Sequence, residues 1–152
     1  MMGMRQLVGF CLLVLGSTLR AWSVDSDKAE YVGGTASLPA KKPGTLQLSS
    51  ATEARFVYKG GEIAIPYKNI ESIEYGQKAG RRIGVAIMVS PIALLSKKRK
   101  HFLTLGYMDA AGAKQGVVIE LGKEIVRSTL VSLETRSGKK IESEDAKKNI
   151  GN

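Results

Sequence analysis

The sequence predicts a mainly β domain that ends with one amphipathic α-helix. From Thr45 to Leu121, short runs of residues alternate between apolar and polar, which is the two-residue period of strands with one buried face. Gly60-Gly61 and the stretch 109–112 separate such runs as turns. After Lys123 the apolar spacing changes to that of a helix. We therefore expect six to seven short antiparallel strands, capped by a helix.

The first three predicted strands lie between residues 45 and 67. Leu46 and Leu48 share one face of the first strand, and Phe56 and Tyr58 share one face of the second. The Gly-Gly turn then predicts a hairpin into "EIAIPY". Proline lacks an amide donor, so Pro66 should end this strand or place it at a sheet edge.

The later strands follow from "NIESIEYG", "KHFLTLGYMD" and "QGVVIELG". The first of these has mixed spacing, which predicts a bulge or a short turn. The other two alternate regularly. Their expected inward-facing residues are Leu103, Leu105, Tyr107, Val117, Ile119 and Leu121.

The predicted C-terminal helix has an apolar stripe facing the sheet. Its members lie on one helical face: Ile125, Val126, Leu130 and Leu133. Gly138 stands where a left-handed residue ends a helix. Residues 141–152 are charged and are expected to form a tail.

The N-terminal 23 residues have the features of a signal peptide. Arg5 precedes an apolar run at 7–16, and Ala21 and Ser23 have the spacing that a signal peptidase recognises. Cleavage after Ser23 is the first interpretation. An uncleaved anchor is the second, although the apolar stretch ends at Arg20 and is short for a membrane span.

Residues 24–44 contain glycines and prolines and few large apolar side chains, so we expect an N-terminal arm with a short strand at Tyr31-Val32. Cys11 is the only cysteine, and the predicted cleavage removes it. An exported chain without cysteine differs from disulfide-rich secreted domains of eukaryotes. We therefore expect a bacterial periplasm or envelope protein, peripheral to the membrane.

Residues 83–96 form an uncharged, mostly apolar segment between basic flanks. One interpretation is an insert at a membrane surface or an envelope protein, with the apolar part buried and the flanks attracted to anions. A second is buried core with solvated charges at its ends, and a third is a protein-docking surface. The expected contact residues are Arg81, Arg82, Ile87, Met88, Val89, Ile92, Leu94, Lys97, Lys98, Arg99 and Lys100.

Catalysis and nucleic-acid binding are not expected from the residue patterns. His101 has no cysteine partner after cleavage, and Glu71 and Glu74 have the spacing of exposed strand positions. No G-x-S-x-G turn or glycine-rich phosphate loop occurs in the sequence. The basic run 97–100 lacks interleaved aromatic residues that could stack on bases. We expect no enzyme activity, cofactor or metal.

Residues 45–140 resemble the pleckstrin-homology-like superfamily in its small bacterial and GRAM-like versions. The resemblance rests on the order of "GTLQLS", "RFVYKG", "EIAIPYKNIESIEYG", "KHFLTLGY" and "VVIELGKE", followed by "EIVRSTLVSLETRSGK". It implies a partly open β-barrel capped by the helix, with lipid or protein binding as its function. The apolar segment 83–96 departs from the pattern, since such barrels have only a loop there.

The formal net charge of +9 favours anionic partners. Together with the predicted signal and the apolar segment, it suggests a non-enzymatic exported binding module at a membrane surface or an envelope protein. The alternative is a soluble structural or scaffolding domain whose apolar segment is buried core.

Overall fold

A computed structural model describes residues 28–36, 38–77, 88–89 and 100–143. The elements in chain order are β1 (Lys28–Gly34), β2 (Lys42–Gln47), β3 (Glu53–Tyr58), β4 (Gly61–Pro66), η1 (Tyr67–Asn69), β5 (Ile70–Gly76), β6 (Met88–Val89), β7 (His101–Met108), β8 (Lys114–Leu121), η2 (Lys123–Ile125), α2 (Val126–Ser137) and β9 (Ile141–Ser143).

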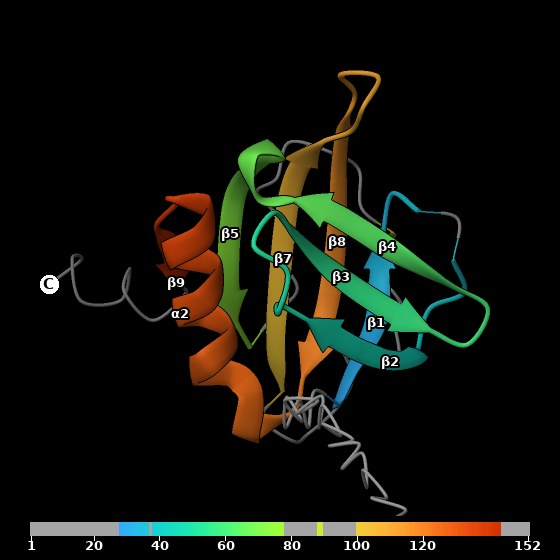
Figure 1. The fold of residues 1–152 in the computed structure, drawn as a ribbon. Coiled ribbons are helices and arrows are strands. Elements are labelled where there is room, and N and C mark those ends of the chain that lie inside the picture. The colour runs from blue at the N-terminus through green and yellow to red at the C-terminus, as the bar shows by residue number, and fades with distance from the viewer. Residues whose placement is uncertain (1–27, 37, 78–87, 90–99, 144–152) are drawn as a thin grey trace, which may run out of the picture.

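The strands of the described residues belong to one sheet. Its order is β4-β3-β2-β1-β8-β7-β5-β9, and β6 pairs with β1 off this path. Two meanders, β1 to β4 and β5-β7-β8, are joined where β1 pairs with β8. The sheet is not closed into a barrel, since β4 and β9 stand at the two ends of the order. In Figure 1, β2, β3 and β4 cross obliquely in front of β7 and β8.

The expected mainly β fold with one C-terminal helix is confirmed. Several local details also agree with the sequence patterns. Tyr58 pairs with Gly61 in the β3–β4 hairpin, and Pro66 ends the edge strand β4. The mixed spacing of residues 69–76 corresponds to the end of the 3-10 turn η1 at Asn69 and to a register shift between Ile70 and Ser72 within β5.

The structure contains more strands than the six to seven expected. β1 extends beyond the predicted short strand at Tyr31-Val32, and it lies inside the sheet, within the segment predicted as an arm. Its glycines and a register shift between Tyr31 and Gly33 interrupt the apolar–polar alternation, so the sequence pattern did not predict the full strand. β6 and β9 are too short for a period to be recognised. β9 also pairs in parallel with β5, so not every pair is antiparallel.

The main core lies between the two parts of the folded sheet and α2. Tyr31, Phe56, Leu103 and Leu105 meet there, and Leu133 from α2 is fully buried among them. Two details of the predicted helix differ, because its first residues form the 3-10 turn η2 and α2 begins only at Val126. Gly138 ends α2 with φ 69°, as predicted.

Candidate binding surface

Most of the expected contact residues lie outside the residues that the structure describes. These are Arg81, Arg82, Ile87, Ile92, Leu94, Lys97, Lys98 and Arg99. The structure places Lys100 directly before β7, and it places the backbone of Met88 and Val89 in β6. The candidate surface is therefore described through Lys100, the backbone of β6 and the strand ends next to them.

Both basic flanks leave the sheet at one place. Gly76, the last residue of β5, is the register partner of Phe102 in β7. Neighbouring strands are about 5 Å apart, so the chain departs and returns at adjacent strand ends. Between Gln77 and Lys100 the sequence has no Asp or Glu. Its basic residues are Lys78, Arg81, Arg82, Lys97, Lys98, Arg99 and Lys100.

Lys100 is fixed to the sheet by an ion pair. Its Nζ lies 2.6 Å from Oε2 of Glu120, and each side chain is about a quarter exposed. Glu120 is the register partner of Phe102, so the pair crosses from β7 to β8 at the strand ends. Lys100 therefore has an acidic partner within the chain, which the sequence pattern did not indicate. The two residues are 20 positions apart in the sequence, so local patterns cannot predict that they pair.

Tyr75 and His101 reinforce the same end of the sheet. The Tyr75 Oη lies 2.6 Å from Nδ1 of His101, and their rings are parallel within 4° with centroids 6.0 Å apart. His101 is the first residue of β7 and pairs with Leu121. The structure places His101 at the start of an internal strand, with Tyr75 of the neighbouring strand as its partner. The stacked rings join β5 to β7 beside the point where the flanks leave.

The apolar segment touches the sheet at β6. Met88 pairs with Gly34 and Val89 with Gly33, antiparallel to β1. β8 occupies one edge of β1, while β2 pairs with residues 28–31 along the other edge. β6 therefore lies on the β2 side of β1. This position is across the sheet from the β5–β7 end.

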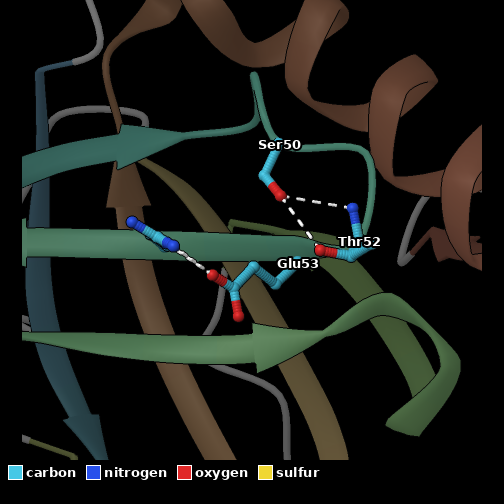
Figure 2. Close-up of polar contacts among 4 residues, drawn as sticks. Ser50, Thr52 and Glu53 are labelled. Carbon is cyan, nitrogen blue, oxygen red and sulfur yellow. Dashed lines mark hydrogen bonds and ion pairs between the residues drawn. The ribbon is translucent and has the colours of Figure 1, made fainter.

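Other polar contacts of the described residues are structural. Ser50 accepts a hydrogen bond from the Thr52 amide in the β2–β3 turn, and Glu53 lies beside them and pairs with Arg55 (Figure 2). Arg136 of α2 donates a hydrogen bond to the carbonyl of Ser50. These contacts connect the turn to the helix that closes the core.

The perturbed tyrosine and aspartate groups do not form one site. Burial raises the pKa of Tyr31 and of Tyr67 in the core, and it also raises the pKa of Tyr107. Asp109 has a lowered pKa because it accepts hydrogen bonds within the β7–β8 turn. Among residues 28–36, 38–77 and 100–143, no group of three or more His, Cys, Asp or Glu side chains is placed to hold a metal ion.

A scan against protein-family models finds no match, and a search of curated proteins finds none either. Within the described part of the chain, no helix has both the length and the apolar character that a membrane span requires.

Proposed function

We propose that this chain is an exported, non-enzymatic binding module that attaches to anionic membrane surfaces through the basic flanks of residues 83–96. The observation that carries the proposal is the pairing of Gly76 with Phe102, which makes neighbours of the two residues that bracket the segment with both flanks. The sequence between these two residues contains seven Lys and Arg residues and no acidic residue.

The physical basis is an additive attraction to phosphate headgroups. Each Lys or Arg close to an anionic surface contributes about 1 kcal/mol, so several together give useful binding where one does not. Arginine binds phosphate through paired N–H donors, and lysine binds it as a point charge. The attraction extends over about 8–10 Å at moderate salt and weakens as salt is added.

The proposed fold family is the pleckstrin-homology-like superfamily. The support is the order of two meanders joined through β1 and β8, followed by a helix that packs on the core through Leu133. Such an arrangement resembles a partly open barrel with its helical cap. Fold alone does not decide what a domain binds, so the proposed ligand rests on the charge of the flanks.

The proposed location is the periplasmic or envelope side of a bacterial membrane. It is supported by the signal-like features of residues 1–23 and by the absence of cysteine from the rest of the sequence. There the module would be peripheral to the membrane.

Vesicle flotation tests the proposal. The purified chain is mixed with vesicles of phosphatidylglycerol and phosphatidylcholine, or of phosphatidylcholine alone. We expect the protein to float with the anionic vesicles at low salt and to remain behind with the neutral ones. Protein that floats with neither preparation contradicts the proposal and favours an envelope protein or no surface partner.

A second candidate function is a soluble structural or scaffolding domain whose apolar segment is core. The observation that favours it is burial of side chains on the face of the sheet opposite the main core: Val32, Phe102 and Val118. This candidate predicts no flotation with vesicles of any charge.

A further inference from the structure

His101 is the one histidine of the sequence, and it lies at the strand ends that adjoin the candidate surface. It is the first residue of β7, between Lys100 and Phe102, and Phe102 is the register partner of Gly76. Consecutive residues of a strand are about 3.3 Å apart, which is shorter than the distance of about 8–10 Å over which charges act at moderate salt. A charge on His101 is therefore felt where residues 77–100 leave and rejoin the sheet.

The His101 ring is hydrogen-bonded to a group that can both donate and accept. Nδ1 lies 2.6 Å from Oη of Tyr75 in β5, and the two rings are parallel within 4°. When the ring is neutral with its proton on Nε2, the Tyr75 hydroxyl donates to Nδ1. When Nδ1 has taken up a proton from the medium, it donates to Oη instead. The contact is kept in both charge states, so proton uptake requires no rearrangement of the strand ends.

Part of the His101 side chain stays open to water. The residue is half-buried, with Tyr75 on one neighbouring strand and its register partner Leu121 on the other. Taking a charge fully out of water is costly, whereas a side chain that keeps contact with water can carry one. His101 can therefore exchange a proton with the surrounding medium.

The elements around His101 carry charges of both signs. Lys100, directly before it, is compensated by Glu120 of β8, with 2.6 Å between Nζ and Oε2. Besides Tyr75, the other titratable side chains of the surrounding described elements are on β1, β5, η2, α2 and β9: Lys28, Glu30, Glu74, Lys123, Glu124, Arg127 and Glu142. Acidic residues are at least as numerous as basic ones in this set. Among the described residues, no excess of positive charge opposes a proton on His101.

We propose that His101 is a proton-dependent binding residue, which strengthens attachment to anionic surfaces when its ring is protonated. The inference rests on the proposed function and adds acidity of the medium as a condition that favours attachment. Histidine is the side chain whose charge changes between about pH 5 and 8. Lysine and arginine keep their charge throughout this range. The basic flanks thus supply the constant part of the attraction, and His101 supplies the part that depends on pH.

The expected effect is that of one added cation. A lysine or arginine close to an anionic surface strengthens binding about fivefold. Because His101 is half-buried, this value is the upper end of its contribution. Protonation should therefore strengthen binding by about two- to fivefold.

Vesicle flotation at two pH values tests the inference. The purified chain is mixed with vesicles of phosphatidylglycerol and phosphatidylcholine at about pH 7.5 and at about pH 5.5, at one ionic strength. The phosphate of phosphatidylglycerol is charged at both values. We expect tighter binding at the lower pH. Equal binding at the two values would overturn the inference and leave the proposed function intact, whereas no binding at either value would overturn both.

Two variants show whether the gain belongs to His101. His101→Gln keeps a hydrogen-bonding side chain that does not change its charge, so its binding should be equal at the two pH values. His101→Arg carries a permanent charge, so it should bind at the higher pH as tightly as the parent does at the lower pH. A gain that persists in His101→Gln would assign it to another group, such as the terminal amine, and would overturn the inference.

A measurement on the parent needs no variant to fold. Proton NMR signals of the His101 ring report its protonation, and the gain in binding should occur over the same pH interval. A gain over a different interval would contradict the inference. Vesicles of phosphatidylcholine alone should bind the protein at neither pH. Binding to them at the lower pH would mean that protonation exposes apolar surface instead of adding charge, and the inference would fail.

Discussion

Lys100 and Glu120 form an ion pair, with 2.6 Å between Nζ and Oε2, at the end of the sheet where both basic flanks leave. Because of this pair, Lys100 is expected to behave differently from the other basic residues of the segment. Its ammonium already has an anionic partner, so it contributes little to the attraction for a surface.

Lys100→Gln should therefore change vesicle binding by less than about twofold, since its charge is compensated in the fold. Its effect on stability should stay below about 1 kcal/mol, which is typical of ion pairs that remain partly exposed. Flotation and urea unfolding measure the two quantities. A loss of binding as large as that caused by changes at residues 97–99 would show that the pair opens at the membrane.

Leu133 closes the main core from α2 and is fully buried. Leu133→Ala should lower the free energy of unfolding by about 2–5 kcal/mol, because it removes buried surface and leaves a cavity. Val131→Ala is the matched control on the same helix, and it should cost less than about 0.5 kcal/mol. Equal effects of the two changes in urea unfolding would mean that α2 does not cap the core.

Asp109 organises the β7–β8 turn. Its Oδ1 accepts hydrogen bonds from the amides of Ala111 and Ala113, at 2.9 and 2.8 Å, and Gln115 donates to Oδ2. These bonds, that from Ala113 foremost, lower the pKa of Asp109 in the folded protein. A carboxyl with a depressed folded pKa stabilises the fold above its unfolded pKa and loses this contribution as pH falls through the folded pKa.

Asp109→Asn should therefore remove part of the acid dependence of stability. Melting temperatures of the parent and the variant should converge as the pH falls below about 4, which is near the unfolded pKa of aspartate. A carbon-13 NMR titration of the Asp109 carboxyl gives the folded pKa directly. A value at or above that of a model peptide contradicts the assignment.

Export makes a separate prediction. Protein recovered from the envelope fraction of an expressing bacterium should begin at or near Val24, because Ala21 and Ser23 have the spacing of a signal peptidase site. N-terminal sequencing decides this. Recovery from the cytosol with Met1 intact would remove the basis for an envelope location.

Much of the fold follows from local patterns in the sequence. The hairpin at Gly60-Gly61, the end of β4 at Pro66 and the stop at Gly138 depend on residues with restricted or unusual backbone angles, and those act locally. The inward faces of β7 and β8 follow from regular alternation. These features need no knowledge of the rest of the molecule.

Other features depend on contacts between distant parts of the chain. β1 became a central strand because β8 and β2 both pair with it, although its own sequence contains two glycines and a register shift. Burial of Val118 and Thr104, which lie outside the main core cluster, cannot be predicted from alternation, because alternation predicts one buried face. The Lys100–Glu120 pair also depends on which strands become neighbours.

The sequence predicted which segment forms the candidate surface, but it did not predict where on the fold that segment is attached. Its basic and apolar composition is evident from the sequence, whereas the convergence of both flanks at Gly76 and Phe102 requires the β5–β7 register. The sequence also left three roles open for the apolar residues.

The most direct test of the central claim compares two triple variants in the vesicle assay. One carries Lys97→Gln, Lys98→Gln and Arg99→Gln in the basic flank. The matched control carries Lys41→Gln, Lys59→Gln and Lys114→Gln, which remove the same charge from exposed positions before β2, after β3 and at the start of β8. The two variants have equal net charge, so only the position of the lost cations differs.

Binding to anionic vesicles at low salt should weaken by about 3 kcal/mol in the flank variant, which is on the order of 100-fold, because three headgroup attractions are lost. Its salt dependence should flatten, and the control should bind within about threefold of the parent since its cations lie away from the surface. Equal losses in the two variants would show that net charge alone attracts the protein, and the account of a localised binding surface would be contradicted.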